Sequence, residues 1–181
     1  MFQRILLPVD NSQYSDLCLE LAVGLAQTFD STIVGYHVYA AQLHQGRFGQ
    51  LETSLPDKYQ QPGVMERQRQ LHASLILQGL ELISRSYLEG CVGRCRERGV
   101  TFETKVAEGK NYAEVVREAA QGYDLVVMGA RGLGEEEGQP LGSVCLRSVR
   151  RLVGVDTLIV KDDAPWGGLI MVALDGSSCS R

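Results

Sequence analysis

The sequence has no excess of positive charge and no long apolar run. Among its 181 residues, 18 are Lys or Arg and 22 are Asp or Glu, so the formal net charge is −4. Nucleic-acid-binding domains concentrate basic residues on one face, and a helix needs roughly 20 apolar residues in succession to span a bilayer. We therefore expect neither nucleic acid nor a membrane among the partners of this chain.

The sequence also lacks the signs of a secretory leader and of a disulfide framework. The N-terminal stretch MFQRILLPVD has one Arg and a short apolar run, without the length or cleavage-site residues of a signal peptide. The five cysteines are odd in number and irregular in spacing, which favours reduced thiols. Together these features predict a cytoplasmic protein.

Strand-like and helical segments alternate along most of the chain, and hydrophobic residues make up 44% of it. Short apolar runs are typical of parallel strands buried on both faces, and between them apolar residues recur at helical spacing. The expected strands are residues 4–9, 31–40, 100–109, 123–129 and 156–162, and the expected helices are residues 12–30, 64–97, 111–121 and 144–153. This order predicts an α/β fold with a doubly wound, parallel, five-stranded sheet.

Local signals predict the helix ends. Asn11 or Ser12 can cap the first helix, which should end near Asp30, and Asn111 can cap the helix that it begins. Residues 41–63 lack a sustained period and contain helix-breaking prolines, so we expect a long loop there. The helix 64–97, with Gly90 as the place for any break, should bury one side, formed by Ala73, Ile76, Leu77, Leu80, Ile83 and Tyr87.

The C-terminal segment resembles the beginning of the chain. Residues 162–168 have the composition of a linker, and residues 169–181 repeat an apolar run followed by Asp and Ser. Aligning Asp175 with Asp10 places Ser177 on Ser12, although short strands of this kind can also look alike by chance. We interpret residues 1–161 as one domain and residues 169–181 as the truncated start of a second, similar domain.

A glycine-rich loop follows the strand 123–129. Gly129 and Asp10 come at the carboxyl ends of two strands that should be adjacent, where open parallel sheets bind ligands. Gly129 and Gly132 allow close approach of the backbone, and Gly142-Ser143 precede a helix N-terminus, which suits an anion. The loop therefore favours phosphate as its ligand.

Two other nucleotide motifs do not fit this loop. No Lys lies between Gly129 and Ser143, so the loop is not a P-loop for phosphoryl transfer. Gly132, Gly134 and Gly138 partly imitate the dinucleotide fingerprint, but that motif belongs after the first strand and at a helix start.

These residues together resemble the nucleotide-binding type of universal stress protein, and the resemblance covers residues 2–161. The family pattern of Gly, two residues, Gly, nine residues, Gly and Ser or Thr is met without insertion or deletion. Three further short segments, on or after the expected strands, also agree with the family pattern. The matching residues are Gly129, Gly132, Gly142 and Ser143, with Pro8-Val9-Asp10, His37-Val38 and Met128-Gly129.

The resemblance implies a flavodoxin-like fold that binds ATP, with Mg²⁺ or Mn²⁺ as a companion ion, and that dimerises through its last strand. By the family pattern, Asp10 and Val38 would contact ribose and adenine, and Gly129 and Gly132 the ribose-phosphate region. The nucleotide-binding residues implied are Pro8, Val9, Asp10, Val38, Met128, Gly129, Gly132, Gly142, Ser143 and Val144, of which the last three would contact the phosphates. No catalytic residue and no metal ligand is assigned.

Several of these residues have a second interpretation. Asp10 can cap the first helix as well as bind ribose, and His37 fits a packed core histidine better than a catalyst. Cys91 and Cys95 fit two ordinary helix thiols better than a redox or metal pair. Glu135, Glu136 and Glu137 would repel a triphosphate unless they face solvent or hold a metal, and we favour solvent.

Three functions remain open from the sequence. The first is an ATP-binding stress-response module without strong catalytic activity, and the second is a dimerisation or interaction module with a vestigial pocket. A slow ATP hydrolase ranks last, because no nucleophile with a base and an orienting group is evident. The strand 156–162 should lie at a sheet edge, where a second copy or the tandem domain would pair with it.

Overall fold

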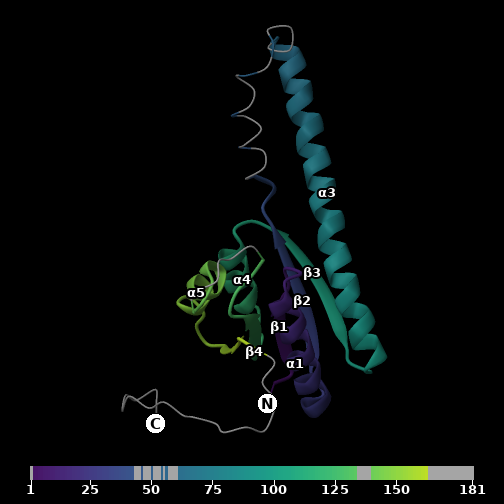
Figure 1. The fold of residues 1–181 in the computed structure, drawn as a ribbon, viewed down its shortest axis with the longest axis vertical. Coiled ribbons are helices and arrows are strands. Elements are labelled where there is room, and N and C mark those ends of the chain that lie inside the picture. The colour runs from purple at the N-terminus through teal and green to yellow at the C-terminus, as the bar shows by residue number, and fades with distance from the viewer. Residues whose placement is uncertain are drawn as a thin grey trace.

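The computed structural model describes residues 2–42, 46, 50, 54, 56, 61–133 and 140–162. Strands and helices alternate through these residues in the predicted order (Figure 1). The strands are β1 (Arg4–Pro8), β2 (Thr32–Tyr39), β3 (Phe102–Glu108), β4 (Leu125–Gly129) and β5 (Asp156–Val160), and the helices are α1 (Gln13–Phe29), α3 (Pro62–Glu97), α4 (Asn111–Ala119) and α5 (Ser143–Val149). None of these helices combines the length and the apolar character that crossing a membrane requires.

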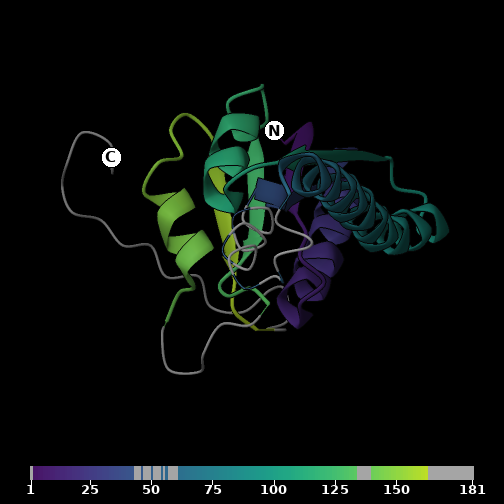
Figure 2. The same cartoon turned by 90° about the horizontal axis from the view of Figure 1, so that it is seen from above.

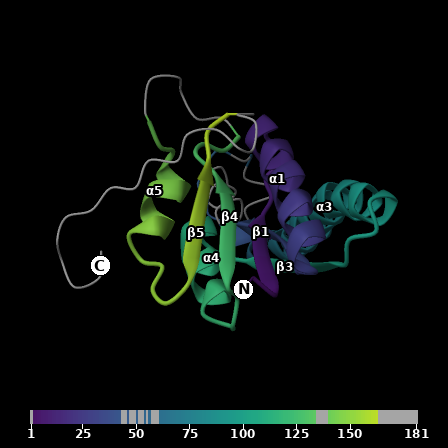
Figure 3. The ribbon, with the colours of Figure 1, turned by 90° about the horizontal axis from the view of Figure 1, so that it is seen from below.

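The five strands form one parallel sheet in the order β3-β2-β1-β4-β5. Figure 3 shows β5 at one side of this sheet, followed by β4 and β1. The prediction of a doubly wound parallel sheet is confirmed. The expected adjacency of the strands that precede Asp10 and the glycine-rich loop is confirmed as well, since β1 pairs with β4.

Helices cover both faces of the sheet, so the core has two layers (Figure 2). Alternate residues of β1 point to opposite faces, as the pleat of a strand requires. Ile5 and Leu7 pack in the layer that contains Leu19 of α1, whereas Leu6 packs in the layer that contains Val115 of α4. A strand buried on both faces must be apolar at every position, which explains the unbroken apolar run in the sequence.

The helix ends confirm one predicted cap and correct another. Ser12 is the N-cap of α1 and accepts a hydrogen bond from Ser15 N–H, and the helix ends at Asp30, whose φ is 55°. Asn111 is the first residue of α4 rather than its cap, since Lys110 occupies the cap position without a side-chain hydrogen bond. The amide of Asn111 is therefore available to line a cavity.

Helix α3 differs from its prediction in start, continuity and buried side. It begins at Pro62, two residues earlier than expected, and its 36 residues pass Gly90 without a break. Its buried side near the sheet consists of Ser84, Leu88, Cys91 and Cys95, while Ile83 of the predicted side is 45% exposed. The reason is that only the C-terminal part of α3 lies against β2 and β3, and the rest projects beyond the sheet (Figure 1).

Candidate functional site

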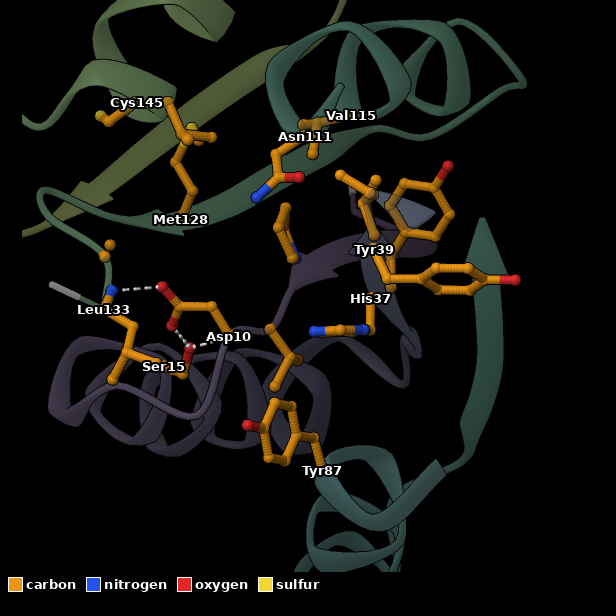
Figure 4. Close-up of a pocket in the computed structure, with 18 of the residues that line it drawn as sticks. Asp10, Ser15, His37, Tyr39, Tyr87, Asn111, Val115, Met128, Leu133 and Cys145 are labelled. Atoms are coloured by element: carbon orange, nitrogen blue, oxygen red, sulfur yellow. Dashed lines mark hydrogen bonds between the residues drawn. The ribbon is translucent and has the colours of Figure 1, made fainter. Parts of the chain in front are cut away.

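A cavity of about 500 Å³ opens at the carboxyl ends of β1, β2 and β4 (Figure 4). The chain leaves β1 toward α1 on one face of the sheet and leaves β4 toward α5 on the other. Such a switch point is where open α/β sheets bind ligands. Helices α3 and α4 supply further walls, and much of the lining is apolar, with Val38, Leu80, Ile83, Val115 and Met128 among its residues.

The carboxylate of Asp10 joins the two sides of this switch point. Its Oδ1 accepts hydrogen bonds from Ser12 N–H at 3.0 Å and from the Ser15 hydroxyl at 2.7 Å. Its Oδ2 accepts a hydrogen bond from Leu133 N–H at 2.8 Å. Asp10 thus supports the first turn of α1 and also tethers the loop after β4, while Ser12 is the actual cap.

The hydrogen bonds of Asp10 determine its protonation state. Burial raises the pKa of Asp10, but hydrogen bonds from Ser12, Ser15 and Leu133 outweigh burial and hold the pKa below its usual value. The side chain is therefore an anion at neutral pH. Its negative charge faces the cavity from the end of β1 (Figure 4).

Two glycines of the loop are required by packing inside the protein. A Cβ atom added at Gly132 would lie 2.5 Å from Asp10 Oδ2, and one added at Gly129 would lie 2.7 Å from the Cβ of Tyr14. Distances this short force a shift of the loop or of its neighbours. The sequence pattern of these glycines is therefore explained in part by contact with Asp10 and Tyr14.

His37 is held in one orientation at the wall of the cavity. Its Nδ1 lies 2.8 Å from Ser84 Oγ, and the Ser84 hydroxyl donates its proton to Leu80 C=O at 2.7 Å. Since that hydroxyl has one proton, Nδ1 of His37 is the donor and Nε2 carries the acceptor lone pair. Burial lowers the pKa of His37 against the opposing attraction of Asp10, and the Tyr87 ring packs edge-on against it. The expectation of a packed histidine is confirmed.

Eight of the ten predicted nucleotide-binding residues line this one cavity. They are Pro8, Val9, Asp10, Val38, Met128, Gly129, Gly132 and Val144. The other two lie directly before Val144 without lining the cavity. Gly142 is the N-cap of α5, with its N–H donating to Ala130 C=O at 2.7 Å, and Ser143 is the first residue of that helix.

The predicted set lacks several polar residues of the lining, among them Ser15, Asn111 and Arg131. Asn111, expected to cap a helix, directs its amide toward the cavity instead (Figure 4). Arg131 stands between Gly129 and Gly132, so the sequence itself shows a cation in the loop, although not the Lys of a P-loop. A guanidinium can donate two parallel hydrogen bonds to phosphate oxygens.

The cysteines and the possible metal ligands form no second site in the part of the chain that the structure describes. Cys91 and Cys95 are buried on α3, where burial raises the pKa of Cys91 and raises that of Cys95 to about 11. Both are packed thiols, as expected. Among the described residues no group of three or more His, Cys, Asp or Glu could hold a metal ion, and Glu135, Glu136 and Glu137 lie outside those residues.

The fold and the cavity together define a class: a flavodoxin-like α/β protein with a ligand cavity at the switch point of its parallel sheet. The chain belongs to the universal stress protein family, whose model matches residues 1–161. It is similar to universal stress protein YxiE of Bacillus subtilis, with 27% identity over 169 residues, 89% of this chain and 100% of that protein. The resemblance expected from the glycine pattern is confirmed.

Solved structures share the fold at low sequence identity. Hypothetical protein MJ0577 aligns with a TM-score of 0.69 and 18% identity, over 90% of this chain and 97% of that one. A universal stress protein in complex with cAMP aligns with a TM-score of 0.55 and 21% identity, over 88% and 97%. An Arabidopsis thaliana family member with AMP bound aligns with a TM-score of 0.55 and 19% identity, over 91% and 97%.

Proposed function

We propose that the protein binds an adenine nucleotide, ATP in the first place, in the cavity between Asp10 and the loop after β4, and that it acts as a regulatory module without strong catalytic activity. The observation that carries the proposal is the convergence of eight motif residues on one cavity at the switch point. Its volume of about 500 Å³ falls in the range of small-molecule sites. Two relatives of the same fold carry AMP and cAMP.

Each part of a nucleotide has a matching part of the wall. The apolar side chains of Val38, Ile83 and Met128 offer a slot for the base, with the amide of Asn111 as a polar partner. A carboxylate has about four acceptor positions, and three hydrogen bonds to Asp10 leave room for a ribose hydroxyl. Arg131 lies on the side of the glycine loop, where phosphates would extend.

The binding of a companion Mg²⁺ or Mn²⁺ would require the phosphates of the bound nucleotide. The described residues contain no group of three or more candidate ligands. Magnesium is commonly held by one or two carboxylates together with substrate phosphates and water. We therefore expect such an ion to bind with ATP and not before it.

The proposal is tested by calorimetry with ATP, ADP, AMP and cAMP on the wild type and on Ile83→Glu. Ile83 lines the cavity and is 45% exposed, so a glutamate there places a charge against the base without burying it in the core. We expect binding by the wild type and a loss of affinity of at least about tenfold in the variant, because a carboxylate must be desolvated.

Ser86→Glu is the matched control, since Ser86 is an exposed residue of the same helix that does not line the cavity. It should bind as the wild type does. Absence of heat from the wild type with all four nucleotides at millimolar concentration would contradict the proposal and favour the vestigial-pocket function. Variants of Gly132 are less diagnostic, because an added Cβ already collides with Asp10.

A further inference from the structure

The projecting part of α3 is apolar on two opposite sides. From residue 66 to residue 83, all of them described, no residue is buried. Leu80 and Ile83 face the cavity, while Leu71, Leu75 and Leu82 are 60%, 58% and 70% exposed. At about 100° per residue these three leucines lie roughly opposite Leu80. A helix that is apolar on opposite sides is ordinarily covered on both.

The far side of α3 has the spacing of a coiled-coil seam. Its residues follow one another in alternating steps of four and three, which is the repeat of the core positions of a heptad. The seam consists of Val64, Gln68, Leu71, Leu75, Gln78 and Leu82. Figure 1 shows that this part of the helix extends beyond the sheet.

We propose that this seam binds the same seam of a second copy of the chain, with the two helices antiparallel. One register matches every seam residue with a residue of its own kind. Leu71 lies opposite Leu75 of the second copy, Gln68 lies opposite Gln78, and the terminal positions pair Val64 with Leu82. Two paired glutamines in a leucine seam specify the register of the two helices. If one helix shifted along the other, a glutamine amide would be buried against leucine without a hydrogen-bond partner.

Charge complementarity supports the same register. Arg67 and Glu81 flank the seam on one side, and both are exposed. The register that pairs Leu71 with Leu75 brings Arg67 of one copy within two residues, or about 3 Å along the axis, of Glu81 of the other, twice by symmetry. In an in-register parallel pair the equivalent flanking positions lie on opposite sides of the seam, so Arg67 of one copy would not meet Glu81 of the other. Flanking charges of this kind decide the orientation of coiled coils.

Cysteine cross-linking of the full chain tests the register. In the antiparallel pair Ser74 flanks the seam on the same side as Ser74 of the second copy and lies about 3 Å from it along the axis, whereas Gln68 lies ten residues, or about 15 Å, from its own equivalent. In a Cys179→Ser background, Ser74→Cys should cross-link with a thiol reagent that spans about 8–10 Å, the distance between packed helices. Gln68→Cys is the matched control and should remain uncross-linked.

Charge exchange tests the partner without touching the core, since Arg67 and Glu81 are exposed. In the Ser74→Cys chain, Arg67→Glu and Glu81→Arg should each weaken association about tenfold, because each replaces two attractive pairs with two repulsive ones. The double variant should restore it. Failure of Ser74→Cys to cross-link, equal cross-linking of Gln68→Cys, or no rescue by the double variant would each overturn the proposal.

Discussion

At the scale of single residues, Asp10 organises the candidate site. Its carboxylate receives three hydrogen bonds, two from the start of α1 and one from Leu133 N–H in the loop after β4. These bonds connect two segments that are more than a hundred residues apart in sequence. A ligand that contacts this carboxylate would therefore also influence the position of the loop after β4.

Replacing Asp10 with Asn should destabilise the fold by about 1–3 kcal/mol at pH 7, because an amide has one acceptor oxygen and presents donors to Ser12 or Leu133. Folding lowers the pKa of Asp10, so its stabilising contribution is complete above about pH 4, the usual Asp value. The contribution is lost as the pH falls through the folded-state pKa. Urea unfolding at pH 7 and at pH 3 measures the difference, which should shrink at pH 3.

Asp156→Asn is the control for that experiment, because it makes the same change at an exposed residue of β5. It should leave the free energy of unfolding within about 0.5 kcal/mol of the wild type. An Asp10→Asn protein as stable as the wild type at pH 7 would show that the tether to Leu133 contributes little.

At the scale of elements, β5 is the last strand of the sheet and pairs with β4 on one side only, among the strands that the structure describes. Asp156 N–H donates to Asp124 C=O, and Val160 C=O accepts from Ala130 N–H. Alternate residues of a strand direct their backbone groups to opposite sides, so Thr157 and Ile159 direct theirs away from β4. An edge of this kind pairs with another strand or is protected from doing so. We propose that it pairs with β5 of a second copy.

Ile159→Pro should weaken that association at least about tenfold, because it removes an outward N–H without removing a donor to β4. Ile159→Ala is the control, since it loses the same packing and keeps the donor. Sedimentation in a Glu81→Arg background, in which the α3 seam is weakened, isolates this edge. A monomeric Glu81→Arg chain at tens of micromolar, or a dimer that survives Ile159→Pro, would contradict pairing through β5.

At the scale of the whole molecule, the residues that form the described core all lie between residues 2 and 162. The family model ends at residue 161, and Val160 is the last buried residue of the core. The prediction that residues 169–181 begin a second, similar domain falls outside the described residues. It stays a prediction, as does the assignment of residues 162–168 to a linker.

Deleting residues 166–181 should change the Tm by less than about 2 °C, roughly the effect of 1 kcal/mol in a chain of this size. The physical reason is that both layers of the described core are built from residues 2–160. Truncation before Asp156 is the positive control, because it removes β5 and the buried Val160. A large loss of Tm on the shorter deletion would show that the C-terminal segment belongs to the core.

The sequence by itself determined the order of the elements, the parallel sheet and the place of the cavity. These follow from local patterns: apolar runs mark strands buried on both faces, Ser12 marks a helix start, and the switch point follows from strand order. The glycine spacing also points to the family, and the family model confirms it.

Only the tertiary structure decided how residues distant in sequence meet. The bond from Leu133 to Asp10 and the amide of Asn111 in the cavity depend on how segments pack against one another, and local propensity does not contain that information. The periodicity of α3 likewise showed apolar residues without showing which side meets the sheet. Because the sheet reaches only its C-terminal part, the exposed seam was decided by packing.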